Sequence, residues 1–249
     1  MKFSDFMLII TGITLIAAIV IITMIAIDVY RNPPSKNSTN DVELTFIAVG
    51  DDNNIYLSSS LSSALPWTKY EKGTTLTYIT KLLDGSFAAI GKSNNRIYTS
   101  LYLNKEYPWI LSNSSQLLKC LIQLKGVGTF AAIGIDNKIY TSPTLTNGGT
   151  WTELTSTKSL IQLTQLNDKT FAGIGTDNKI YTSPTLTNGV TWTNPGSTAL
   201  LLSLIQLSDN TFAGIGTDKK IYTSGSLTTN TDWKEEPNSC CFISLTTNT

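Results

Sequence analysis

The sequence predicts an all-β fold, a five-bladed β-propeller of four-stranded blades, preceded by one N-terminal transmembrane helix. Three aromatic residue types recur once per unit, and successive copies of each lie 41 to 43 residues apart. A period of this length is typical of propellers and solenoids, because one repeat cannot bury its apolar face without its neighbours. The aromatic positions are Phe46, Phe87, Phe130, Phe171 and Phe212; Tyr56, Tyr98, Tyr140, Tyr181 and Tyr222; Trp67, Trp109, Trp151, Trp192 and Trp233.

The first predicted element is an apolar helix near the N-terminus. Residues 7–27 form an almost unbroken apolar run of 21 residues. As a helix that rises about 1.5 Å per residue, this run spans the roughly 30 Å hydrocarbon core of a bilayer, so the lipid bilayer is its predicted partner. Lys2 flanks the run on one side, and Arg31 and Lys36 flank it on the other. The charges therefore leave the orientation open.

This anchor divides the chain into four parts. Residues 1–6 are a short N-terminal tail, residues 7–29 the transmembrane helix, residues 30–40 a linker and residues 41–249 the propeller. We expect a single-pass membrane protein whose propeller lies outside the bilayer. The side is undetermined, and a cell surface or a virion membrane is favoured.

Turn residues divide each repeat of the propeller into short strands. In the fourth repeat, residues 160–166, 171–175, 179–183 and 191–193 are strand-like, and Asn, Asp, Lys and Gly occupy the segments between them. Asn, Asp and Gly supply the positive backbone angles that tight hairpins require. Four antiparallel strands per unit are typical of a propeller blade. We interpret the aromatic columns as packing between blades.

The two ends of the repeat region complement each other. The first unit begins at its second strand, residues 43–50, and the last strand, residues 242–245, matches residues 204–207 of the preceding innermost strand. We therefore predict that the C-terminal strand supplies the missing innermost strand of blade 1. Such closure leaves the ring without an open edge.

The three cysteines do not form a disulfide framework. Cys120 and Cys241 belong to units that are not adjacent, and the neighbours Cys240 and Cys241 could pair only with strain. We expect buried free thiols.

The composition excludes several kinds of chemistry. The chain has no histidine, the commonest general base and a common transition-metal ligand. The formal net charge is zero and the lysines are spread over the repeats, so nucleic acid is not an expected partner. We expect no catalytic residue, no metal site and no cofactor, and a protein that is not an enzyme. The acidic residues stand in hairpin positions where Asp is common: Asp51, Asp136, Asp177 and Asp218 in one set of turns, and Asp84, Asp168 and Asp209 in another.

One polar column is the candidate ligand-binding site. Counted back from each Phe, the middle of each innermost strand holds a polar residue that Leu follows. Such residues are expected to line the central channel, where water satisfies them. A solvated channel wall and a ligand site both remain open. The residues are Lys81, Gln123, Gln165, Gln206 and Ser244.

Two stretches carry a resemblance to a known family. Residues 137–143 and 178–184 both read Asn-Lys-Ile-Tyr-Thr-Ser-Pro. With the Trp151 and Trp192 that follow them, they resemble the blade of the tachylectin-type five-bladed β-propeller lectins. The similarity covers residues 41–249, although the family's Gly-Gly-Trp segment ahead of the innermost strand has no counterpart here. The resemblance implies a lectin that binds N-acetylated sugars on each blade or between blades.

A fainter likeness is to the Asp-box repeats of sialidases. Thr144, Gly148, Thr150 and Trp151 fit the alternating pattern, with Thr146 in the place of Asp. Sialidase chemistry would need a cluster of arginines on the substrate carboxylate, and the repeat region holds only Arg96. We reject sialidase activity for this reason.

Two classes of function follow from these observations. The first is a membrane-anchored, non-catalytic recognition module with a glycan or protein partner on the propeller. The alternative is a structural membrane-anchored component of a virion or another protein shell.

Overall fold

The computed structural model describes most of the repeat region. The predicted tail, transmembrane helix and linker lie outside the described residues. Within the described part of the chain, no helix is both long enough and apolar enough to span a bilayer. The described residues are 45–61, 67–70, 75–103, 108–145, 149–228, 233–237 and 239–248.

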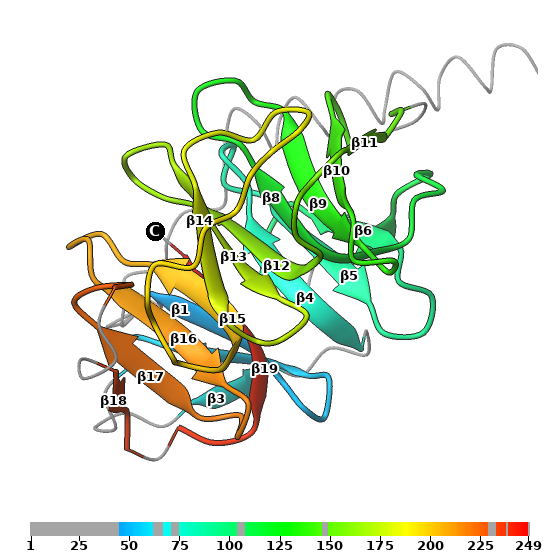
Figure 1. The fold of residues 1–249 in the computed structure, drawn as a ribbon. Helices are drawn as coiled ribbons and strands as arrows, with labels where there is room; N and C mark the ends of the chain where they lie inside the picture. The colour runs from blue at the N-terminus through cyan, green and yellow to red at the C-terminus, as the bar shows by residue number, and fades with distance from the viewer. Residues whose placement is uncertain are drawn as a thin grey trace, which may run out of the picture. The chain divides into compact units, whose positions relative to one another are not determined.

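Five antiparallel sheets form the blades of a propeller (Figure 1). The innermost strands are β4 (Leu76–Lys81), β8 (Leu118–Gln123), β12 (Leu160–Gln165), β15 (Leu201–Gln206) and β19 (Phe242–Thr247). The second strands are β1 (Phe46–Gly50), β5 (Phe87–Gly91), β9 (Phe130–Gly134), β13 (Phe171–Gly175) and β16 (Phe212–Gly216). The third strands are β2 (Ile55–Ser58), β6 (Ile97–Ser100), β10 (Ile139–Ser142), β14 (Ile180–Ser183) and β17 (Ile221–Ser224).

The outermost strands are the shortest. They are β3 (Thr68–Tyr70), β7 (Ile110–Leu111), β11 (Thr152–Leu154) and β18 (Lys234–Glu235). In blade 4 an isolated bridge between Thr182 and Thr193 takes the fourth position. The prediction of a five-bladed, all-β propeller is therefore confirmed.

The ring is closed by the end of the chain, as predicted. β19 pairs with β1, so that Phe46 lies opposite Thr247 and Ala48 opposite Leu245. In Figure 1 the red C-terminal strand and the blue first strand belong to one blade. Hydrogen bonds replace a peptide connection here, and the innermost edge of blade 1 is filled. We call this β1–β19 junction the seam.

The core draws on the innermost, second and third strands of each blade, and the middle of the innermost strands is its most regular part. The fourth residue of each is at most 1% exposed: Ile79, Leu121, Leu163, Leu204 and Leu245. Burial of each such side chain stabilises the fold by about 1.5–3 kcal/mol. The Phe residues that begin β5, β9, β13 and β16 are also buried, which supports their interpretation as packing residues. In blade 1, the rings of Trp67 and Phe242 lie 4.8 Å apart.

A glycine ends each second strand because a tyrosine and a turn side chain cover it. At Gly216, a Cβ atom would lie 2.5 Å from Asp218 Oδ1 and 2.7 Å from the Tyr222 ring. The Tyr222 hydroxyl donates to Asp218 Oδ2 over 2.7 Å. Blades 1, 3 and 4 repeat this tyrosine–aspartate hydrogen bond. These aspartates are thus part of the scaffold.

The expectation of three buried free thiols is correct for Cys120 and wrong for the other two. Cys120 is a buried free thiol. Cys240 and Cys241 form a disulfide, and both residues are exposed. They lie on the surface loop before β19, where the backbone at Cys241 takes a positive φ of 77°.

Candidate functional site

A cavity of about 390 Å³ lies where the innermost strands end, at one end of the central channel. Every blade contributes to its wall. The last residues of the innermost strands line it, namely Lys81, Gln123, Gln165, Gln206 and Thr247. So do the residues just before them, Thr80, Ile122, Thr164, Ile205 and Thr246. The sequence analysis identified four residues of the first set and missed the whole of the second.

Ser244 does not belong to this column. Phe242 lies opposite Gly50, just as Leu201 lies opposite Gly216, so Ser244 is the counterpart of Ser203. Thr247 takes the place that the sequence analysis gave to Ser244. Ser244 is 1% exposed and is not among the residues that line the cavity. The predicted register of the closing strand was therefore three residues off.

The three glutamines connect neighbouring blades. Gln123 Oε1 accepts the backbone N–H of Leu83 over 2.8 Å, from the β4–β5 turn of blade 2. Gln165 and Gln206 accept the N–H groups of Lys125 and Asn167 over 2.7 Å, each from the preceding blade. We call these contacts the glutamine latches. A backbone N–H can only donate, so each latch fixes the amide oxygen on the turn, and the amide N–H₂ group is the donor. Gln123 Nε2 donates to the Gly128 carbonyl over 3.2 Å, and Gln206 Nε2 to the Asn210 carbonyl over 3.5 Å.

The cations of the cavity come from blades 2 and 3. Lys81 Nζ donates to the carbonyl of Asn248 over 2.5 Å, at the end of the closing strand. Lys125 Nζ donates to Asn167 Oδ1 over 3.2 Å. Among the described residues, no carboxylate lines the cavity. The nearby Asp168 is held in its own turn by Thr170, whose side-chain and backbone hydrogen bonds lower the pKa of that carboxyl.

Tyr78, which also contributes to the cavity wall, and the residues Cys120 and Gln162 behind the wall are buried and neutral. Burial raises the pKa of the Tyr78 phenol well above its usual value and that of the Cys120 thiol to about 12. At neutral pH this thiol is protonated, which makes it a poor nucleophile. Gln162 Nε2 donates to Thr164 Oγ1 over 2.8 Å and to the Leu204 carbonyl over 3.1 Å. These side chains supply packing and inter-blade contacts.

A second pocket, of about 310 Å³, lies on blade 5. Asp218, Tyr222, Trp233 and Leu200 contribute to its wall. The indole N–H of Trp233 has no acceptor among the described residues, whereas that of Trp151 in blade 3 donates to Ser114 Oγ. The indole N–H of Trp192 in blade 4 likewise has no acceptor among the described residues. The sequence analysis treated this tryptophan column as packing, and repeat positions alone cannot reveal which of its donors are unsatisfied.

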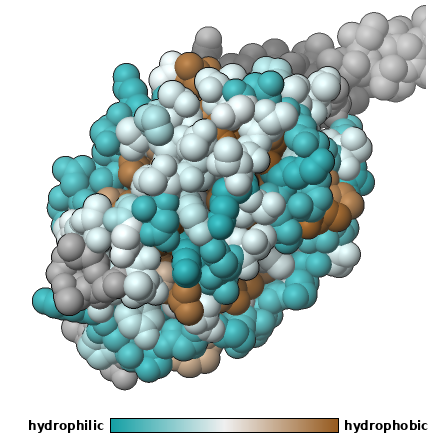
Figure 2. Space-filling model, viewed as in Figure 1, coloured by the Kyte–Doolittle hydropathy of each residue, from teal (hydrophilic) through white to brown (hydrophobic). Residues whose placement is uncertain are grey.

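The visible face of the molecule is mostly hydrophilic or neutral, with small separate hydrophobic areas (Figure 2). The outermost strand of blade 2 contributes exposed apolar side chains, with Ile110 at 64% and Leu111 at 40% exposure. The outermost strands of blades 1, 3 and 5 carry Lys or Glu instead. Charged residues of this kind protect sheet edges from pairing with other chains.

These features define the class of protein, a closed five-bladed β-propeller with an axial cavity. No protein-family model and no curated protein matches the chain. Several solved structures share the fold. A symmetrical protein described in work on its de novo evolutionary emergence has a TM-score of 0.55 and 12% identity, over 81% of this chain and 93% of that one.

Two further similar structures carry enzyme names. A protein described as a "putative gluconolactonase" has a TM-score of 0.54 and 10% identity, over 81% of this chain and 80% of that chain. Virginiamycin B lyase from Staphylococcus aureus has a TM-score of 0.44 and 15% identity, over 79% of this chain and 71% of that chain. At 10% identity the similarity to the first of these structures shows the fold alone.

The comparisons correct one expectation. The sequence analysis expected a protein that is not an enzyme, and this is overturned because the propeller fold is shared with a protein that is described as an enzyme. Absence of histidine excludes histidine-dependent chemistry only. Of the tachylectin-type resemblance, the part that is supported is the fold, a five-bladed propeller.

Proposed function

We propose that the propeller is a recognition module that binds a sugar residue of a glycan in the axial cavity. The observation that carries this proposal is the convergence of polar side chains from all five blades on one cavity of about 390 Å³. This volume lies in the range of small-ligand sites, which combine apolar walls with a few placed polar groups. The resemblance of the blade sequences to lectin propellers supports the same class of ligand.

The chemistry of the wall suits a polyhydroxylated ligand. Amide N–H₂ groups, threonine hydroxyls and the apolar side chains of Ile122 and Ile205 share the wall of the cavity. Sugar hydroxyls both donate and accept hydrogen bonds, and the carbon face of a sugar ring packs on apolar groups. The glutamine latches hold the amide groups in place before a ligand arrives, which reduces the entropic cost of binding.

A glycan array probed with the full-length chain tests the proposal, followed by calorimetry with the sugar that binds best. In the variant Thr247→Tyr the ring occupies the cavity, so we expect at least about tenfold weaker binding, which is about 1.4 kcal/mol. Thr152→Tyr on the exposed outer strand β11 is the matched control and should bind normally. A silent array contradicts glycan recognition, and unchanged binding by Thr247→Tyr contradicts the axial location.

We also propose that residues 7–29 tether this module to a membrane. Support comes from the 21-residue apolar run within this segment, which is long enough to cross a bilayer. A tethered module would meet glycans that are fixed to a surface or carried by a partner.

A further inference from the structure

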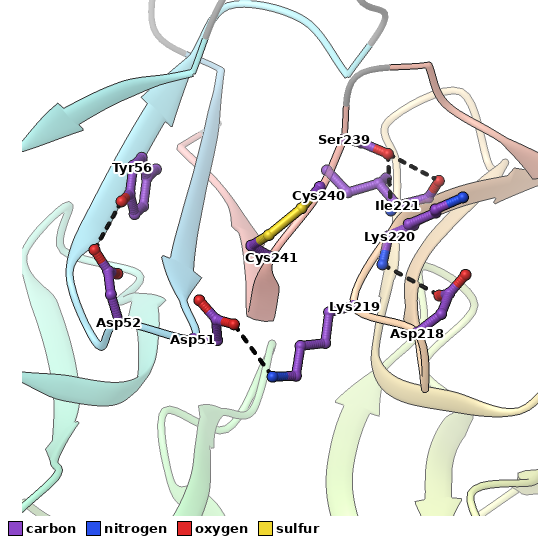
Figure 3. Close-up of a disulfide and its surroundings, with 10 residues drawn as sticks. All are labelled: Asp51, Asp52, Tyr56, Asp218, Lys219, Lys220, Ile221, Ser239, Cys240 and Cys241. Carbon is purple, nitrogen blue, oxygen red and sulfur yellow. Dashed lines mark hydrogen bonds and ion pairs between the residues drawn. A yellow bond between two sulfur atoms is a disulfide. The ribbon is translucent and has the colours of Figure 1, made fainter.

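The loop that leads into the closing strand carries an accessible disulfide. Cys240 and Cys241 are bonded to each other, and both are exposed. Figure 3 shows this disulfide between the turn of Asp51, which follows β1, and the turn of Lys219, which joins β16 to β17. The disulfide therefore lies where the first described strand, β1, meets the last strand, β19.

The two backbone groups of the Cys241–Phe242 peptide unit hold the seam together. The carbonyl of Cys241 accepts the N–H of Asp51 over 2.8 Å. The next N–H, that of Phe242, donates to the carbonyl of Lys219 over 3.1 Å. An ion pair of 3.2 Å between Lys219 Nζ and Asp51 Oδ2 joins the same two turns (Figure 3). The conformation of Cys241 thus controls how β19 is tied to both neighbours.

The other blades make the same hydrogen bonds without a disulfide. In blade 3, Ile135 N–H donates to the Leu117 carbonyl over 3.2 Å, and Leu118 N–H donates to the Asn95 carbonyl over 2.8 Å. Cys241 corresponds to Leu117 in this comparison. Of the five equivalent residues before the innermost strands, Cys241 alone has a positive φ, at 77°. Residues other than glycine rarely adopt this left-handed conformation, because their Cβ crowds the backbone.

We infer that Cys240 and Cys241 form a thiol–disulfide exchange site whose oxidation state sets the conformation of the seam. A thiolate of a dithiol reductant attacks one sulfur and releases the other cysteine as a thiolate, which gives a mixed disulfide. The second thiol of the reductant then displaces the bound cysteine. Two electrons and two protons pass to the cysteine pair, and the reductant leaves as a disulfide.

Reduction acts on the seam because it opens the small covalent ring through the Cys240–Cys241 peptide bond. Without that ring, Cys241 is free to leave the left-handed region, and the carbonyl on its C-terminal side turns away from Asp51. The inference goes beyond the proposed glycan recognition and does not depend on it. The experiment that tests the inference therefore measures a local property of the seam and needs no ligand.

The test is hydrogen exchange of the Asp51 amide in the full-length chain, with and without a small dithiol. We expect the Asp51 amide to exchange about tenfold faster after reduction. A residue in the left-handed conformation costs about 1–2 kcal/mol, and a free-energy difference of this size changes an equilibrium by about this factor. The Ile135 amide in blade 3 is the internal control and should not change. Thiol titration of the folded protein should detect no accessible thiol before reduction and two afterwards, since Cys120 is buried.

The double variant Cys240→Ser with Cys241→Ser is the second control, and the reductant should leave its Asp51 exchange unchanged. If that variant does not fold, the wild-type comparison of Asp51 with Ile135 still decides. Unchanged or slower Asp51 exchange after reduction overturns the inference. So do two accessible thiols in the protein before reduction.

Discussion

A single glutamine on each of three innermost strands ties its blade to a turn of the preceding blade. The donors in these glutamine latches are backbone N–H groups of turns, which no strand partner satisfies. Removing the acceptor leaves such a group without a partner, and the cost depends on how far water can replace it. The latches occupy the exposed end of the channel, so water compensates for part of the loss.

The latch of blade 5 gives a prediction about stability. In Gln206→Leu the N–H of Asn167 loses its acceptor at 2.7 Å. We expect the free energy of unfolding to fall by about 0.5–1.5 kcal/mol, the net value of one such hydrogen bond. Gln206→Glu keeps an oxygen in the same place and should stay close to the wild type at neutral pH. Urea unfolding of the three proteins measures this, and equal losses in both variants would contradict the latch.

The aspartates of the β-turns give a prediction about pH. Partial desolvation raises the pKa of Asp52, but hydrogen bonds from Asn54, Tyr56 and Lys69 outweigh it and bring the pKa down to about 2. The folded state therefore binds fewer protons than the unfolded state between this value and the ordinary 3.8. Stability that is present above pH 3.8 is lost as the pH falls through this window.

Unfolding midpoints measured across the acid range test the effect. Asp52→Asn removes the titrating group, so the decline of its midpoint between about pH 4 and about pH 2 should be shallower than in the wild type. The lowered pKa values of Asp136, Asp177 and Asp218 give the rest of the decline the same sign. Parallel curves for the variant and the wild type would show that Asp52 does not titrate as described.

At the scale of the element, the closing strand shows how far sequence reasoning reached. Its existence was predictable, because a first blade without an innermost strand requires an apolar strand from the other end of the chain. Its register was not, since Phe242-Ile243-Ser244-Leu245 matches both residues 201–204 and residues 204–207. Each innermost strand also has a register shift within its first residues, which interrupts the simple alternation of faces.

The functional residues show the same limit. The repeat period marked the polar column, so Gln123 and its equivalents could be found from sequence. Their latches could not, because each partner N–H lies about 40 residues away on another blade. The Cys240–Cys241 disulfide was missed for a related reason. The pairing depends on the backbone conformation of a loop, which no repeat position specifies.

Removal of the closing strand tests its role as an element. A chain that ends at Pro237 lacks β19, including the buried side chains of Phe242 and Leu245. We expect the cooperative unfolding transition to be lost, because the innermost edge of blade 1 and the packing of both neighbouring blades are exposed together. A synthetic peptide of residues 238–249, added in excess, should restore the transition by pairing with β1. An unchanged transition in the truncated chain would contradict closure by β19.

At the scale of the whole molecule, five similar blades are distinguished by a few local departures. Blade 2 has Lys81 where blades 3 to 5 have glutamine, and blade 1 has Thr247. The seam adds the disulfide and the Lys219–Asp51 ion pair, which have no counterpart among the described residues of the other blades. The scaffold is therefore periodic, while the cavity wall and the seam are asymmetric. A ligand in the axial cavity would contact a different set of groups on each side.

The last prediction concerns how the chain is held in the cell. The propeller closes with residues 46–50 and 242–247, so residues 1–40 are not needed for its ring. We expect residues 41–249 to stay in the soluble fraction and to unfold at the same midpoint as the full chain. The full chain should stay with membranes during alkaline carbonate extraction, because moving 21 mostly apolar residues into water is costly. Replacing Leu15 and Ile19 by Lys in the full chain is the matched control and should release it, since a charge at the centre of a helix costs about 2.5–3.5 kcal/mol. Release of the unmodified full chain by carbonate would contradict a membrane-spanning anchor.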